Sequence, residues 1–272
     1  MRSPRRLVIL GVLLTLAMAV GYPVIRILRQ QAAVTALRRP GLHVEIDPPW
    51  FDAWVKRDWY TRNLGTVRRV RIVGRITVRD LEILNRMDTL RWLEFDTASE
   101  KAWLNLPTHI PKLAIGLPDA GLSLAARRQL SRMQFDELMI RRMVGDGTLP
   151  IDVNVLEPLG KLPRLKSLDL IDATVSGDFL LDLVLTLPNL KRLEIRNAGL
   201  QDEDLEPLSH LAHLQELRLR DNHRLTDACL SHLGKLPSLR ILKIDQWGGL
   251  TEPGLDGLRS SRPDVQIITN QD

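Results

Sequence analysis

The sequence lacks most of the motifs that identify catalytic or metal-binding proteins. It contains no G-x-S-x-G nucleophile motif, no phosphate-binding glycine loop, no C-x-x-C and no H-E-x-x-H. Its single cysteine, Cys229, cannot form an internal disulfide, and its place at the start of an expected helix predicts a buried apolar role. We therefore expect no catalytic residue, no metal ligand and no cofactor, and predict that the protein is not an enzyme.

Positive charge is scarce in the body of the chain, although the whole protein has a formal net charge of +5. Residues 1–62 carry a net charge of +6, which leaves −1 for residues 63–272. Nucleic-acid binding requires a basic face on the folded domain. A near-neutral body does not offer one, so we expect no nucleic-acid partner.

Long apolar stretches are also rare, because only residues 7–25 run for 19 positions without a charge. This length can cross a bilayer, and it follows a basic N-terminus at residues 1–6. The favoured interpretation is a single transmembrane helix, or signal anchor, with the rest of the chain outside the cytoplasm. Cleavage of a signal peptide near Ala19, giving a secreted or periplasmic protein, is the alternative, and a cytosolic repeat domain is a third.

Aromatic residues make up only 4% of the chain, yet they cluster in residues 26–66. This segment is predicted to begin as a juxtamembrane helix that ends at Pro40. The cluster consists of Trp50, Phe51, Trp54, Trp59 and Tyr60. We interpret it as a cap over the first unit of a repeat domain, with a patch for docking a partner as the alternative.

Leucine is abundant, and from residue 67 to residue 272 it recurs in one repeated phrase, L-x-x-L-x-L. The first positions recur at steps of 23, 20, 25, 30, 25, 24 and 25 residues. The phrase appears as Val67, Val70 and Ile72; Leu90, Leu93 and Phe95; Ile110, Leu113 and Ile115; Phe135, Leu138 and Ile140; Leu165, Leu168 and Leu170; Leu190, Leu193 and Ile195; Leu214, Leu217 and Leu219; and Leu239, Leu242 and Ile244. Arg262, Val265 and Ile267 form a ninth, partial unit.

Each unit joins two kinds of spacing. The L-x-L pair points both side chains to one side of a strand, whereas the later L-x-x-L pair matches one face of a helix. Thr226 and Thr251 precede acidic residues, as helix N-caps commonly do. Such a unit cannot bury both apolar faces alone, so the pattern predicts a stack of units.

The phrase at residues 225–230, Leu-Thr-Asp-Ala-Cys-Leu, resembles the I-T-D-x-x-L signature of leucine-rich repeats of the cysteine-containing subtype. The resemblance covers residues 67–268 and implies an α/β solenoid, with a curved parallel sheet on the concave face and short helices on the convex face. Residues 33–50 also resemble the segment that follows the hydrophobic anchor in some bacterial leucine-rich-repeat proteins. That likeness implies an extracytoplasmic location and no defined ligand.

Two units depart from the regular spacing. The 20-residue step leaves residues 103–107 on the convex side. Apolar and polar residues alternate within them, which predicts an extended segment. The 30-residue step contains a Gly-Asp-Gly-Thr turn at residues 145–148. Asp146 and Asp152 supply too few oxygen ligands for a calcium site.

The outward residues of the strands are expected to form three columns on the concave face. Where like charges crowd, they favour an acidic partner, although opposite charges side by side also favour simple cross-strand pairing. Such pairs are expected between Arg71 and Glu94, Arg192 and Glu216, and Glu194 and Arg218. The candidate binding residues are Arg192, Arg196, Arg218, Arg220 and Lys243, with Met139, Ile171 and Ile241 as apolar contacts.

The sequence therefore predicts a non-catalytic, membrane-anchored scaffold that binds another protein on its concave face, and it does not indicate an oligomeric state. The expected organisation is a basic N-terminus at residues 1–6, a transmembrane helix or signal peptide at 7–25, a juxtamembrane helix and aromatic cap at 26–66, and a solenoid of eight to nine repeats at 67–272. Two alternatives remain: a secreted or periplasmic ligand- or glycan-binding protein, and an adaptor like the F-box substrate receptors if the repeats are cytoplasmic.

Overall fold

The computed structural model describes residues 32, 35, 42–47, 66–85, 90–98, 100–108, 110–117, 122–142, 159, 162, 164–245 and 249–269. The basic N-terminus, the apolar run at residues 7–25, the aromatic cluster and the turn around Asp146 lie outside these residues. Within them, no helix combines the length and the apolar character needed to cross a membrane.

The described strands form one sheet of ten strands, in the order in which they occur along the chain. All neighbouring pairs from β2 to β10 are parallel, and β1 alone pairs antiparallel, with β2. The strands are β1 Leu42–Asp47, β2 Thr66–Ile76, β3 Trp92–Ala98, β4 Lys112–Leu117, β5 Glu137–Arg142, β6 Ser167–Ile171, β7 Arg192–Arg196, β8 Glu216–Arg220, β9 Ile241–Ile244 and β10 Gln266–Ile268.

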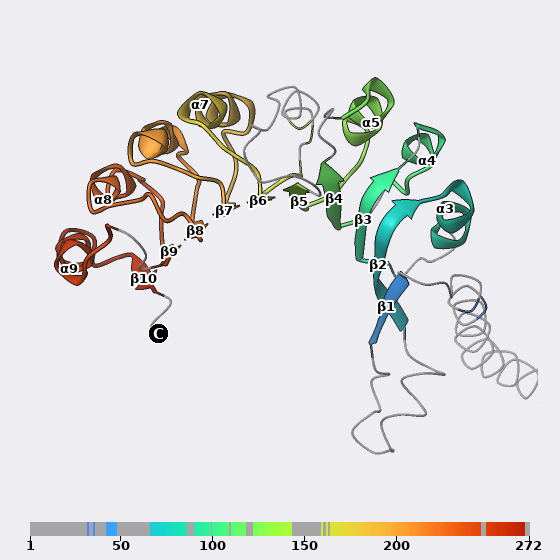
Figure 1. Ribbon diagram of the computed structural model, residues 1–272, viewed down its shortest axis with the longest axis horizontal. Coiled ribbons are helices and arrows are strands. Elements are labelled where there is room, and N and C mark those ends of the chain that lie inside the picture. Colours follow the sequence, from blue (N-terminus) through green and yellow to red (C-terminus); the bar gives the residue numbers. More distant parts are fainter. Residues whose placement is uncertain are drawn as a thin grey trace, which may run out of the picture.

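Helices follow most of the strands and lie on the opposite side of the solenoid (Figure 1). In Figure 1 the strands line the inner side of an arc and the helices its outer side, as the repeat pattern predicts. The helices are α3 Val78–Leu84, α4 Glu100–Leu104, α5 Leu124–Leu130, α7 Gly177–Thr186, the 3₁₀ helix η3 Glu203–His210, α8 Cys229–Leu233 and α9 Glu252–Ser261.

The core is a continuous row of apolar side chains between the sheet and the helices. Leu168, Leu193, Leu217 and Leu242 are register partners on β6 to β9, and each is 0% exposed. Side chains that alternate along a strand point to opposite faces, so these inward leucines leave the residues beside them on the concave face. The predicted register is confirmed.

The threonines of the helix phrase act in two ways. Thr251 caps α9 as predicted, since its Oγ1 accepts a hydrogen bond from the backbone N–H of Gly254 at 3.2 Å. Thr226 was predicted to cap the preceding helix, but α8 begins only at Cys229, with Ala228 at the cap position. Thr226 instead donates its hydroxyl hydrogen to Asp202 Oδ2 of the previous repeat at 2.6 Å.

The prediction of an extended segment at residues 103–107 is wrong in its first part. Helix α4 spans Glu100–Leu104, and Ala102 and Trp103 are buried on its inner side. The Trp103 ring packs edge-on against Phe95, with 5.5 Å between the centroids. The helix begins in Glu100, Lys101 and Ala102, all good helix formers, upstream of the alternating stretch that suggested a strand.

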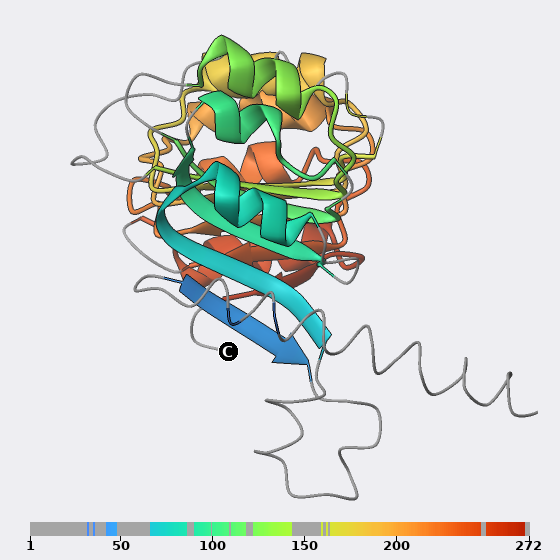
Figure 2. The ribbon, with the colours of Figure 1, turned by 90° about the vertical axis from the view of Figure 1, so that its right-hand side faces the viewer.

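The two ends of the sheet are closed in different ways. At the N-terminal end β1 pairs with β2 (Figure 2), a strand that the alternating residues 42–47 could have indicated. At the C-terminal end the guanidinium of Arg262, which replaces the first leucine of the phrase, donates to the carbonyl oxygens of Gly234 and Leu236 at 2.8 and 2.9 Å. This contact satisfies backbone acceptors that face the end of the solenoid.

Substitution of an inward leucine should destabilise the protein far more than substitution of a residue on the concave face. Leu217→Ala removes a fully buried side chain and should lower the free energy of unfolding by about 2–5 kcal/mol. Arg220→Ala, on the same strand but exposed, should change it by less than about 1 kcal/mol. Urea denaturation of both variants tests this, and equal midpoints would contradict the register.

Candidate functional site

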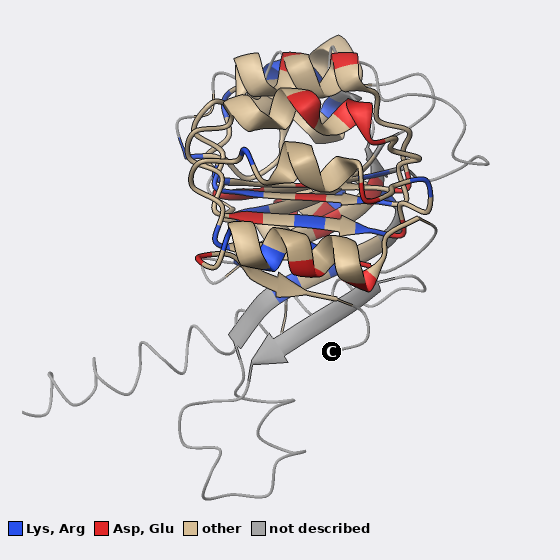
Figure 3. Ribbon diagram, turned by 90° about the vertical axis from the view of Figure 1, so that its left-hand side faces the viewer, with Lys and Arg blue, Asp and Glu red and all other residues tan. Residues whose placement is uncertain are grey.

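The concave face is formed by the outward residues of β2 to β9, which the register brings into three columns. The first column passes from Arg69 to Ile241, the second from Arg71 to Lys243, and the third includes Arg196 and Arg220. Figure 3 shows basic and acidic residues interleaved along these strands. The first two columns agree with those predicted from the sequence. The third agrees from Gly116 to Arg220, but the register between β2 and β3 shifts after Ile72, so Val73 and Asp96 are not partners.

At the N-terminal end of this face, the buried carboxylate of Glu94 is surrounded by cations. Its oxygens lie 3.1 Å from Arg71 and 3.5 Å from Arg141, and 3.7 Å from Arg69. The predicted pair of Arg71 and Glu94 is therefore present. Because its partners come from β2 on one side and β5 on the other, we expect Glu94 to hold strands of the sheet together rather than to face a ligand.

The same end contains Trp92 between two cations. The guanidinium of Arg69 lies 3.3 Å from the centroid of the Trp92 ring, and the Lys112 ammonium lies 4.2 Å from it. Such cation–π contacts are attractive. They also occupy the ring, so Trp92 does not offer an open stacking surface.

The centre of the face carries two neighbouring carboxylates, Asp169 on β6 and Glu194 on β7, which are register partners. Arg192 Nη2 lies 3.4 Å from Asp169 and 3.4 Å from Glu194. The predicted neighbour of Arg192, Glu216, instead bonds Arg218 at 2.6 Å. Arg218 also reaches Glu194 at 3.4 Å, as predicted.

The C-terminal end of the face is positively charged. Arg196 and Arg220 are register partners, as are Arg218 and Lys243. Arg196 Nε donates to Asp221 Oδ2 at 2.7 Å, and this bond raises the pKa of Arg196. Among the described residues, neither Arg220 nor Lys243 has an ion pair.

The structure brings most of the predicted binding residues together, but not all of them. Ile171 is the register partner of Arg196, and Ile241 lies on the same strand as Lys243. Met139 lies on β5, four strands from Lys243 on β9, which corresponds to about 19 Å at the usual strand spacing. Arg192 and Arg218 are half-buried and paired with carboxylates, whereas Arg220 and Lys243 have no ion pair among the described residues and Arg196, although bound to Asp221, is exposed. We call Arg196, Arg220 and Lys243 the cationic group.

Sequence reasoning missed the residues that turn the chain at the end of each strand. Asp172, Asn197 and Asp221 follow β6, β7 and β8 with positive φ values of 55°, 49° and 54°. Asn and Asp adopt this left-handed conformation more readily than other side chains with a Cβ. Their recurrence at one repeat position was the available signal, and Asp221 is the residue that holds Arg196.

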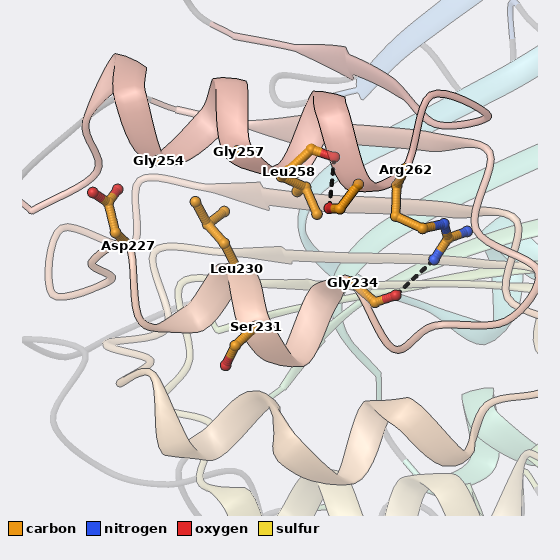
Figure 4. A pocket seen from close by; sticks show the side chains of 9 residues that line it. Asp227, Leu230, Ser231, Gly234, Gly254, Gly257, Leu258 and Arg262 are labelled. Atoms are coloured by element: carbon orange, nitrogen blue, oxygen red, sulfur yellow. Dashed lines mark hydrogen bonds between the residues drawn. The ribbon is translucent and has the colours of Figure 1, made fainter.

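A second concave feature lies on the other side of the molecule, between α8 and α9 (Figure 4). It has a volume of about 440 Å³ and is lined by Asp227, Leu230, Ser231, Gly234, Gly254, Gly257, Leu258, Ser261 and Arg262. The polar residues at its two ends, Asp227 and Arg262, already form hydrogen bonds within the protein. Asp227 accepts hydrogen bonds from Thr251, and Arg262 donates to the Gly234 carbonyl.

The described residues offer little for catalysis. They contain no group of three His, Cys, Asp or Glu side chains suited to a metal ion. Burial raises the pKa of the Cys229 thiol to about 12, and its side chain is fully buried, so the thiolate needed for reactivity does not form near neutral pH.

Comparison with protein-family models finds no match, and comparison with curated proteins finds none either. Solved structures with a similar course of the chain include yeast Rad7 bound to Elc1 (15% identity, TM-score 0.45, covering 70% of this chain and 59% of that one) and human 5T4 (17%, 0.47, 75% and 86%). TLR13 bound to ssRNA13 is a third (14%, 0.36, 69% and 36%). The chain thus spans less than two thirds of Rad7 and of TLR13.

The fold is a leucine-rich-repeat solenoid. This assignment follows from the chain's own repeats and register, because the structural likenesses are too low to add to it. The cysteine-containing subtype and the bacterial resemblance remain predictions from the sequence.

The central carboxylate predicts a defined dependence of stability on pH. Burial raises the pKa of Asp169 from 3.8 to about 6; Arg192 opposes the shift and Glu194 adds to it. The folded protein therefore binds a proton more tightly than the unfolded chain, so ionisation of Asp169 costs stability as pH rises from 4 to 6. Asp169→Asn should gain about 1–3 kcal/mol relative to wild type across this interval.

Urea denaturation of both proteins at several pH values between 4 and 7.5 measures this difference. Glu206→Gln, an exposed carboxylate on η3, serves as the control and should show no such trend. If the difference in free energy of unfolding between Asp169→Asn and wild type stays constant from pH 4 to pH 7, the raised pKa of Asp169 is disproved.

Proposed function

We propose that this protein is a non-catalytic binding scaffold whose concave face binds an acidic surface of another protein. The observation that carries the proposal is the excess of positive charge at the C-terminal end of that face. Arg196 and Arg220 are cross-strand neighbours of like charge, an arrangement that costs stability unless a negative group lies nearby. Asp221 supplies one such group to Arg196, while among the described residues neither Arg220 nor Lys243 forms an ion pair.

Apolar side chains beside this charge support a protein partner. Ile171 and Ile241 are half-buried and lie within one or two strands of the cationic group. Protein interfaces combine apolar contacts with a polar and charged surround. Met139 lies farther along the face and would contact only a partner that extends across several repeats.

We also propose that residues 7–25 anchor the protein in a membrane and that the repeats lie outside the cytoplasm. The support is the sequence itself: 19 residues without a charge after a basic N-terminus. Cleavage near Ala19 would give the same extracytoplasmic repeats without the anchor.

Charge reversal tests the binding face. Capture of partners by the immobilised Arg220→Glu/Lys243→Glu protein should lose the main partner held by wild type, with affinity reduced at least about tenfold. The matched control is Lys191→Glu/Lys235→Glu, two exposed lysines in the loops that precede β7 and follow α8. Undiminished capture by the first variant would remove the cationic group from the interface.

Location is tested by membrane fractionation and protease treatment of intact cells. A membrane anchor predicts that the protein sediments with membranes and that protease digests the repeats without cell lysis. Full protection from protease would place the repeats in the cytoplasm, and a soluble chain beginning after Ala19 would establish the cleaved form.

A further inference from the structure

The centre of the concave face contains buried polar groups that lack full hydrogen bonding. Ser167, Asp169 and Glu194 are only 6%, 4% and 9% exposed. Among the described residues Ser167 Oγ has no hydrogen-bond partner, although Ser167 lies two residues from Asp169 on the same face of β6. We call Ser167, Asp169 and Glu194 the central cluster.

The one cation that reaches both carboxylates of the cluster is loosely placed. Arg192 Nη2 is 3.4 Å from each oxygen of Asp169 and 3.4 Å from Glu194, and Arg192 Nε has no partner. Some ion pairs on the same face are shorter, at 2.6 Å for Arg218 with Glu216 and 2.7 Å for Arg196 with Asp221. Arg192 is therefore shared between two carboxylates rather than bound to one.

Charge balance around the cluster is short by one cation. Three carboxylates, those of Asp169, Glu194 and Glu216, face the two guanidinium groups of Arg192 and Arg218. The nearest ammonium, that of Lys112, lies 2.6 Å from Glu137 and balances that residue instead. The central cluster, counted together with Glu216, Arg192 and Arg218, thus carries a net charge of −1 beside the positively charged cationic group.

Buried polar groups without hydrogen bonds are costly, so this arrangement favours a group that donates several. A lysine ammonium has a positive charge and three donors, enough for Asp169, Glu194 and Ser167 together. A neutral donor would satisfy Ser167 but leave the charge imbalance.

We propose that the central cluster is a subsite for a basic side chain, in the first instance a lysine, of the partner whose acidic residues meet the cationic group. This inference rests on the proposed function and specifies the chemistry of the partner. Asp169 on β6 and Arg220 on β8 are two strands apart and offset by two residues along the strand, which corresponds to about 12 Å, or about three to four residues of extended chain. The partner therefore presents a lysine and an acidic pair about three to four residues apart.

Peptides of this design test the subsite. Acetyl-Lys-Gly-Gly-Glu-Glu-amide and its Gln twin, acetyl-Gln-Gly-Gly-Glu-Glu-amide, are titrated calorimetrically into the full-length protein in detergent at low salt and pH 7.5. Wild type should bind the Lys peptide about tenfold more tightly than the Gln peptide, the scale expected for hydrogen bonds to a charged group. In Asp169→Asn this preference should fall below about twofold, and Ser167→Ala should reduce it.

Control variants separate the two proposals. Glu206→Gln should keep the tenfold preference, while Arg220→Glu/Lys243→Glu should weaken both peptides. Equal affinity of wild type for the two peptides, or a preference that persists in Asp169→Asn, overturns the subsite and leaves the acidic partner standing. Failure of wild type to bind either peptide overturns both proposals.

Discussion

The constraint on which the rest of the structure depends is that no single repeat can bury its own apolar faces. Leu168, Leu193, Leu217 and Leu242 lie in one fully buried row, each covered by the repeats before and after it. A shift of one residue in any strand would turn these leucines to solvent. The core therefore fixes the register, and the register fixes which side chains stand next to each other on the concave face. Function on this face follows from the packing beneath it.

On the convex side, acidic residues link successive repeats. Asp202 accepts hydrogen bonds from the backbone N–H and the hydroxyl of Thr226, at 2.8 and 2.6 Å, and Asp227 accepts the same pair from Thr251. The sequence suggested that Asp227 favours the positive end of its own helix, but it binds the following repeat. The contact also explains Gly254, since a Cβ there would lie 2.3 Å from the Asp227 carboxyl carbon. The Thr-Asp phrase thus acts as a connector as well as a helix start.

The periodic features of this fold could be predicted from the sequence, and the irregular ones could not. The first two concave columns, and the third from β4 to β8, were predicted correctly because inward leucines at fixed spacing leave only one register, whereas the shift after Ile72 was not visible in the sequence. The short α4 was missed because Leu104 and Leu106 fit an alternating pattern, and the packing of Trp103 against Phe95 was not visible in the sequence. The partner of Arg192 was missed for another reason. A long side chain on the face can reach its own strand or either neighbour, and the choice depends on the burial of Asp169 and on competition from Arg218 for Glu216.

The charges of the concave face are distributed unequally, and this distribution separates structural from binding roles. Where cations surround a buried carboxylate, as at Glu94, the interactions are satisfied within the sheet and hold the strands together. Toward the centre one guanidinium, that of Arg192, is shared between Asp169 and Glu194, and strands β8 and β9 carry three cations and one acid. In the described part of the chain this face buries Asp169 without a close partner, near strands that carry unpaired cations. Exchanging two side chains would remove both unpaired charges, so stability alone does not explain the arrangement. The separation of a negative centre from a positive end is the property that a partner of mixed charge can use.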